Sequence, residues 1–281
     1  GPSKRSRKDR VMTSQGSGSE ASHSAKSLAQ KHFGGQSAAY TRSGLLSDQG
    51  NLDTVIRLAE VTDKDRVLDV ATGTGFLAAA ICRVSREVVA TDITVSMLEE
   101  ARNRTEKEGN ARFALADVEH LPFAGDSFDL VTCRIALHHF PRPQVALSEM
   151  TRVCRPKGRV VIMDVVSSED EAKSEYHNRM ERLRDVSHVK EYRRSELQEM
   201  IEGSGLAVAM VQLWPFTWSF DDWMLLGGPD AATAEAVRAM MLDSIEGDKS
   251  GLQVQLREGE LRFTYTTAIV VGRKGDGHGK R

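Results

Sequence analysis

The stretch from Val67 to Ala78 reads VLDVATGTGFLA and decides the fold class of this chain. Its first residues have the composition of a short buried strand, and an apolar run that suits a helix starts at Phe76. Gly73 and Gly75 stand between the two, and glycine adopts positive φ and lets a ligand approach the backbone closely. The start of a helix also offers free N–H groups and a positive end. The stretch therefore predicts a strand, a glycine-rich turn and a helix that bind a ligand together.

Outward from this stretch, short apolar runs alternate with amphipathic stretches. We expect strands at 67–70, 88–90, 112–116, 128–133, 159–166, 206–213 and 262–271, and helices at 76–84, 95–108, 143–154, 168–189, 194–205 and 218–251. The first five runs are nearly continuous, which is typical of strands buried on both faces of a parallel sheet. Strands that alternate with helices, joined by right-handed connections, predict a doubly wound α/β fold.

Two kinds of ligand suit the glycine turn. Gly73-x-Gly75-x-x-Ala78 fits the dinucleotide fingerprint, and Asp92 follows at a plausible distance for a ribose contact. Asp69 lies four residues before the first glycine, where its negative charge opposes a pyrophosphate. The same charge suits a ligand that carries an ammonium and a sulfonium group. The turn alone is compatible with either ligand.

Further residues establish a resemblance. Asp69-x-x-x-Gly73-x-Gly75 resembles the first motif of the class I S-adenosylmethionine-dependent methyltransferases. Asp92 is similar in position to the acid that holds both ribose hydroxyls in that family, and Asp117 lies where the family contacts adenine. The segments LPF at 121–123 and DSFD at 126–129 resemble the lead into the family's fourth strand, and 263–273 resembles its terminal strand. The resemblance implies a mostly parallel seven-stranded sheet with helices on both faces and an antiparallel last strand.

The resemblance also implies a cofactor, S-adenosyl-L-methionine, and a set of residues that bind it. These cofactor-binding residues are Tyr40, Asp69, Ala71, Thr72, Gly73, Gly75, Asp92, Ile93, Met97, Ala116, Asp117, Val118, Cys133 and Arg134.

The segment RIALHHF at 134–140 resembles the subgroup around the ubiquinone/menaquinone C-methyltransferases, and Phe33 and Tyr40 resemble its N-terminal lid. A neutral histidine near the reacting methyl group can take a proton from the acceptor. We expect His138 to do so and His139 to be structural, since adjacent side chains point in different directions. The predicted pocket is lined by Tyr40, His138 and part of an insertion at 168–192.

The acceptor is expected to be a small molecule. The aromatic and cationic residues of that insertion form either a solvated helix face or a site for an aromatic or anionic substrate. The segment at 133–136 reads CRIA and lacks the [DN]-P-P-[FY] motif of amide and adenine methyltransferases, which disfavours methylation of DNA bases. No carboxylate cluster suggests a magnesium site, so no metal is expected.

Composition narrows the class further. The chain has 281 residues and a net charge of −2, unlike a general nucleic-acid binder. No run approaches the roughly 18 apolar residues of a membrane span, and no secretory signal is visible. The three cysteines form no C-x-x-C pair. We expect a cytoplasmic enzyme, with no nucleic-acid partner and no membrane span.

The expected organisation has five parts. They are a disordered basic and Ser/Gly-rich tail at 1–27 that includes a cloning remnant, a helical lid at 28–65, the cofactor-binding core at 66–166, a substrate cap at 167–193, and the rest of the same sheet with a helical insertion at 194–281.

Methyl transfer to a small molecule is the leading hypothesis. Two alternatives remain, a NAD(P)-dependent oxidoreductase and a protein that binds the cofactor without transferring its methyl group. A base is needed only if the acceptor must lose a proton.

Overall fold

The computed structural model describes residues 16–41 and 44–276. Its strands are β1 (Arg66–Val70), β2 (Glu87–Asp92), β3 (Ala111–Leu115), β4 (Phe128–Arg134), β5 (Cys154–Val166), β6 (Leu206–Ser219), β7 (Gln255–Arg257) and β8 (Glu260–Lys274). Its helices are α1 (Gly16–Thr41), α2 (Gly44–Ser47), α3 (Gln49–Leu58), α4 (Phe76–Cys82), α5 (Val95–Thr105), α6 (Pro143–Val153), α7 (Glu171–Arg184), α8 (Arg194–Gly203), α9 (Phe220–Gly227) and α10 (Ala231–Ile245), with short 3₁₀ turns η1 (Val118–His120) and η2 (Leu137–His139).

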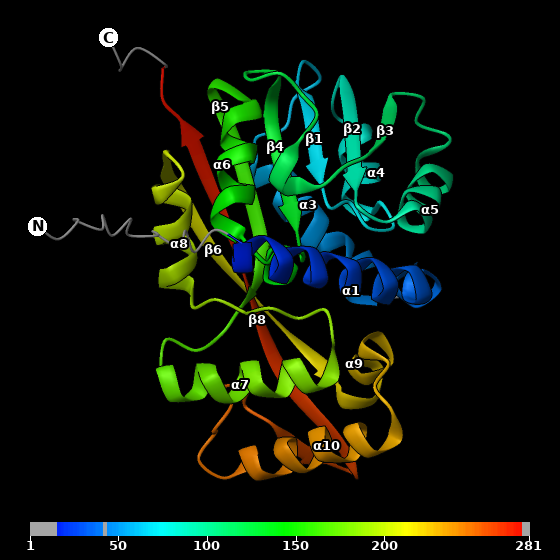
Figure 1. Ribbon diagram of the computed structural model, residues 1–281, viewed down its shortest axis with the longest axis vertical. Coiled ribbons are helices and arrows are strands. Elements are labelled where there is room, and N and C mark those ends of the chain that lie inside the picture. The colour runs from blue at the N-terminus through cyan, green and yellow to red at the C-terminus, as the bar shows by residue number, and fades with distance from the viewer. Residues whose placement is uncertain (1–15, 42–43, 277–281) are drawn as a thin grey trace, which may run out of the picture.

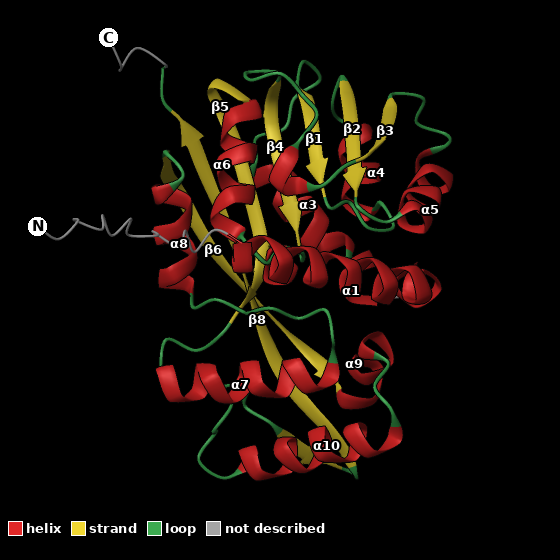
Figure 2. Cartoon of the chain, in the orientation of Figure 1, coloured by secondary structure: helices red, strands yellow, loops and turns green. Residues whose placement is uncertain are grey.

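These strands form one sheet in the order β3-β2-β1-β4-β5-β8-β6 (Figure 2). The first five are parallel, and β8 lies antiparallel between β5 and β6. The predicted doubly wound fold with an antiparallel last strand is therefore confirmed. The described part of the sheet has an eighth strand, β7, which pairs with β8 through three exposed residues. So short and polar a segment shows no strand pattern in the sequence.

Helices cover both faces of the sheet. Leu147 of α6 and Leu197 of α8 join the buried strand residues of one face, whereas Val55 of α3 and Ile81 of α4 join those of the other. The long strands β6 and β8 continue past the parallel strands to a third cluster with α7, α9 and α10 (Figure 1). Trp223 is among its most buried side chains. The cap at 167–193 is thus built on the far ends of two antiparallel strands.

Helix α1 starts at Gly16 and runs across the carboxyl ends of the parallel strands (Figure 1). This corrects the predicted tail, because residues 16–27 are helical; residues 1–15 lie outside the described part. The Ser/Gly-rich composition of this segment suggests disorder, but tertiary contacts hold it. Lys26 Nζ donates to Asp117 Oδ2 at 2.7 Å and also contacts Glu119.

The glycine turn has the backbone that the motif requires. Gly73 and Gly75 have φ of +55° and +82°. Gly75 is the N-cap of α4, and a Cβ atom there would lie 2.7 Å from the Ala101 Cα of α5. The missing side chain at this position therefore allows α4 to pack against α5.

We expect Gly75→Ala to lower the free energy of unfolding by about 2–4 kcal/mol, because it combines a positive φ with a steric clash. Gly73→Ala is the matched control, since its Cβ would meet no atom within 4 Å. That variant should lose only about 1–2 kcal/mol. Urea denaturation measures both, and equal losses would contradict this account of Gly75.

Candidate functional site

A pocket opens at the carboxyl ends of β1, β2 and β4, beneath α1, and encloses about 1070 Å³ when the open solvent at its mouth is included. Ligands of open α/β sheets bind at this edge. Most residues predicted to bind the cofactor line it: Tyr40, Asp69, Ala71, Thr72, Gly73, Asp92, Ile93, Met97, Ala116, Asp117, Val118 and Arg134. Gly75, Cys133 and His138 are not among its lining residues.

Asp92 ends β2 and ties the glycine turn to that strand. Its Oδ2 accepts a hydrogen bond from Gly73 N at 2.9 Å, and its Oδ1 accepts one from Thr94 N at 2.9 Å. Burial raises the pKa of this carboxyl, although the two backbone hydrogen bonds oppose the shift. The carboxylate faces the pocket and retains lone pairs for a ligand with hydroxyl groups.

Asp69 lies one strand away and is held by two hydroxyls. Thr72 Oγ1 donates to its Oδ2, and Thr132 Oγ1 donates to its Oδ1, each at 2.6 Å. Burial raises the pKa of this carboxyl to about 6, although both hydrogen bonds lower it. A cation placed in the pocket would favour the ionised form of Asp69.

Arg134 ends β4 and contributes a positive charge to the same pocket. Its Nε donates to Asn51 Oδ1 of α3 at 3.1 Å, and its Nη2 donates to the Leu46 carbonyl of α2 at 3.1 Å. Burial lowers the pKa of this guanidinium to about 10, which still leaves it charged at neutral pH. The next residue, Ile135, has φ of +53°, an uncommon conformation for a β-branched side chain.

Two predicted cofactor-binding residues, Cys133 and Gly75, do not line the pocket. Cys133 is 1% exposed, and burial raises the pKa of its thiol. Gly75 shapes the turn from the α4–α5 side.

The histidine pair differs from the prediction. His138 Nδ1 lies 2.7 Å from Asp164 Oδ1, and His138 N donates to the other Asp164 oxygen at 3.0 Å. Burial lowers the pKa of His138, but its pairing with Asp164 raises the value to about 9. These bonds direct His138 toward β5, and His139 is the histidine that lines the pocket. This corrects the placement of His138 in the pocket wall.

His139 packs with its ring edge against Phe33 of α1, at a centroid distance of 4.8 Å and an interplanar angle of 88°. Its Nδ1 lies 3.1 Å from both the Ser187 carbonyl and the Ser187 hydroxyl, and that hydroxyl donates to Asp185 Oδ1 at 2.6 Å. Burial and the neighbouring His138 charge lower the pKa of His139 to about 4. The ring is therefore neutral at neutral pH.

No residue of the insertion at 168–192 lines the pocket, contrary to the prediction. The insertion acts from behind, because Ser187 holds His139 and the backbone N–H groups of Val189 and Lys190 donate to the His138 carbonyl. Lys26 was missed, since a single lysine in a Ser/Gly-rich segment carries no signal. Glu119 also lines the pocket, and its carboxylate accepts hydrogen bonds from both Lys26 and Arg142.

Among the described helices, none combines the length and apolar character that crossing a bilayer requires.

Comparisons with known proteins identify the family of this chain. Residues 68–162 match the family model described as a methyltransferase domain. The uncharacterized methyltransferase YcgJ of Bacillus subtilis is 35% identical over 201 residues, which cover 71% of this chain and 79% of that protein. Its crystal structure superposes with a TM-score of 0.76 at 32% identity and covers 81% of this chain and 99% of that one.

Two further relatives carry quinone-related names. The demethylmenaquinone methyltransferase of Clavibacter sepedonicus is 38% identical over 46% of this chain, and the ubiquinone/menaquinone biosynthesis C-methyltransferase UbiE of Azotobacter vinelandii is 40% identical over 39%. The match covers 54% and 46% of those two proteins, about half of each. On the match to YcgJ, which spans more than two thirds of both proteins, and on the fold, the chain belongs to the class I S-adenosylmethionine-dependent methyltransferases.

Proposed function

We propose that the pocket binds S-adenosylmethionine and that the protein methylates a small-molecule acceptor, with release of S-adenosylhomocysteine. One observation carries this proposal: Asp69 and Asp92 meet the glycine turn at the floor of a single pocket. When bound, the cofactor supplies an electrophilic methyl group on a sulfonium that leaves without further activation.

The residues present fit that cofactor. In the proposed complex, Asp92 accepts hydrogen bonds from the ribose hydroxyls, and Asp69 balances the positive charges of the methionine part. Asp117 lies at the third strand end, beside the adenine position that the family resemblance implies. The buried Asp69 carboxylate favours this ligand over a nicotinamide dinucleotide, because its negative charge would repel the pyrophosphate, whereas Asp92 suits the ribose of either ligand.

The other residues that line the pocket mainly serve to align the cofactor with the acceptor. Holding donor and acceptor in line can contribute about 7–11 kcal/mol to a displacement reaction. Phe33 and Tyr40 of α1 pack edge to face at 5.6 Å and cover the pocket together with His139. A cover of this kind excludes water from the reacting groups.

His139 is the candidate base where the acceptor must lose a proton. Contact with Ser187 engages Nδ1, which leaves Nε2 as the ring nitrogen available to an acceptor. Because the neutral form dominates at neutral pH, the ring can receive a proton without first losing one.

The pocket wall suits an aromatic acceptor. Phe33, Leu46 and Phe140 are among its lining residues. The insertion's Arg184, which could have bound an anion, is buried against Glu181 and the Trp223 carbonyl instead. The quinone-related names of two relatives support the same class of acceptor.

A metabolite screen with S-adenosylmethionine, read by mass spectrometry, tests the proposed function. We expect release of S-adenosylhomocysteine together with one methylated small molecule. Tight cofactor binding without release over a broad screen would favour a protein that binds the cofactor without transfer. Reduction or oxidation of a nicotinamide dinucleotide instead would favour the oxidoreductase.

The raised pKa of Asp69, about 6, makes cofactor affinity depend on pH. Below that value the free protein holds Asp69 protonated and neutral, so a cationic cofactor must displace the proton. Affinity should therefore be about tenfold weaker at about pH 5 than at about pH 7. Calorimetry on wild type and Asp69→Asn isolates this effect, because Asp92 is present in both. Identical pH profiles would remove Asp69 from the charge balance.

Substitutions of the adjacent residues His138 and His139 form a matched pair that tests which histidine acts as the base. His139→Gln should leave cofactor affinity within a few fold and lower turnover by about 10²-fold or more for an acceptor that loses a proton. His138→Gln should lower the melting temperature through loss of the Asp164 pair, with normal turnover of the folded fraction. The reverse pattern would return the base to His138.

A further inference from the structure

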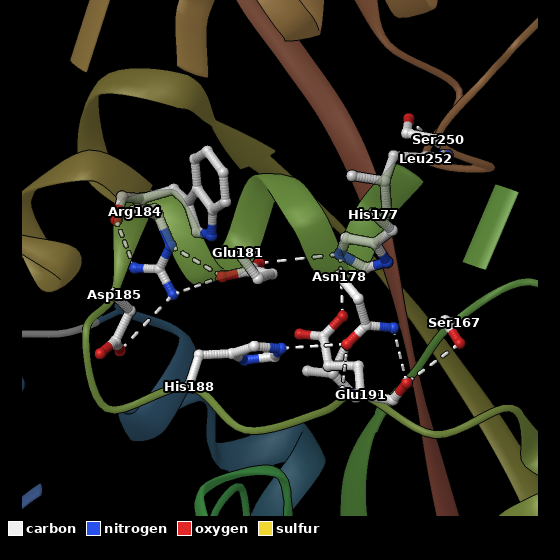
Figure 3. A network of polar contacts seen from close by, with 12 residues as sticks. Ser167, His177, Asn178, Glu181, Arg184, Asp185, His188, Glu191, Ser250 and Leu252 are labelled. Carbon is white, nitrogen blue, oxygen red and sulfur yellow. Dashed lines mark hydrogen bonds and ion pairs between the residues drawn. The ribbon is translucent and has the colours of Figure 1, made fainter. Parts of the chain in front are cut away.

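A second cluster of chemically active side chains lies outside the cofactor pocket, where α7 faces the chain segment that follows it (Figure 3). His177 and Glu181 are one helical turn apart on α7, and Glu191 reaches them from the returning segment. The three residues are 0%, 1% and 2% exposed. None of them lines the pocket described above.

The three side chains point toward one another (Figure 3). His177 Nε2 lies 2.8 Å from Glu191 Oε2 and 3.7 Å from Glu181 Oε1, and one ligand atom from each residue lies within 4.8 Å of the others. Among the described residues, these three atoms have no hydrogen-bond partner outside the trio. Nitrogen and oxygen ligands lie about 2.0–2.2 Å from a zinc ion, so neighbouring ligand atoms are about 3 Å apart.

Two other residues orient the carboxylates. Arg184 donates from Nε to Glu181 Oε2 at 2.9 Å, which leaves Glu181 Oε1 directed at His177. Asn178 accepts from Glu191 N at 2.7 Å and donates to the Glu191 carbonyl at 2.9 Å, and so fixes the returning segment on α7. Partners of this kind position the ligands of metal sites.

The charges of the cluster also call for a cation. Figure 3 contains three buried carboxylates, Glu181, Asp185 and Glu191, and one buried guanidinium, that of Arg184. Buried charges are costly unless they are compensated. One divalent cation would neutralise the four groups together. In the competing arrangement His177 is protonated and its Nε2–H pairs with Glu191 Oε2, but the Nδ1–H is then buried without a hydrogen-bond acceptor among the described residues.

We propose that His177, Glu181 and Glu191 bind one divalent transition-metal ion of the zinc class. One imidazole with two carboxylates suits such an ion, because imidazole favours transition metals over calcium and magnesium. The ion joins α7 to the segment that carries Ser187, and it thereby supports the loop behind His139. Its role is structural, since the ligands lie outside the pocket.

Calorimetric titration of zinc into the untagged, chelator-stripped full chain tests this site without any cofactor. We expect wild type to bind one equivalent and to melt at a higher temperature when loaded. His177→Gln and Glu191→Gln should each weaken binding by at least about tenfold and abolish the thermal shift. Glu175→Gln is the control on the same helix, because that side chain is 69% exposed and pairs with Arg182 at the surface.

Three outcomes would overturn the site: no zinc-dependent shift in wild type, unchanged binding in both variants, or equal loss in the control. Anomalous diffraction at the zinc edge from wild-type crystals tests the site without relying on variants that fold poorly. A peak between the three side chains is expected, and a peak elsewhere would assign the zinc to another site. Cofactor affinity is read separately, so failure here leaves the proposed function untouched.

Discussion

The hydrogen bond from Gly73 N to the Asp92 carboxylate is the interaction on which the rest of the site depends. It joins the turn after β1 to the end of β2 and places a buried carboxylate beside exposed backbone at the floor of the pocket. Asp69 repeats the arrangement one strand away, where the hydroxyls of Thr72 and Thr132 hold it. The parallel strands supply the register, and the positive φ of Gly73 directs its N–H group inward. The pocket is therefore a consequence of two strand ends and one turn.

This locality explains why much of the site could be predicted from the sequence. Asp69, Gly73 and Asp92 lie within two adjacent βα units, so their spacing along the chain sets their spacing in the fold. The order of the strands follows from the same alternation. The β7 hairpin strand shows the limit of the method, since three exposed residues bury no apolar surface that a pattern could reveal.

Other residues depend on partners that are distant in the chain. The choice between His138 and His139 is made by Asp164, whose carboxylate takes the first ring and leaves the second to the pocket. Lys26 is held by Asp117 and Glu119, about ninety residues away, in a segment whose composition suggests disorder. Neither pairing has a signature in local sequence, because both result from packing between separate elements.

The segment at 167–193 contacts the pocket residue His139 from outside the pocket. Ser187 contacts His139 from behind and is itself held by Asp185, while His177, Glu181 and Glu191 hold the same segment on α7. Asp69, Gly73 and Asp92 lie inside the matched methyltransferase domain at 68–162, whereas this support comes from the part of the chain beyond it. Acceptor choice is therefore expected to depend on the lid and on the cap behind it, and cofactor choice on the floor.

Calorimetric titration of the wild-type chain with S-adenosylmethionine, and separately with a reduced nicotinamide dinucleotide, tests the central claim most directly. The account predicts one equivalent of S-adenosylmethionine bound and no measurable binding of the dinucleotide, because the Asp69 carboxylate favours a cationic ligand and repels a pyrophosphate. Binding of the dinucleotide without S-adenosylmethionine binding would contradict it.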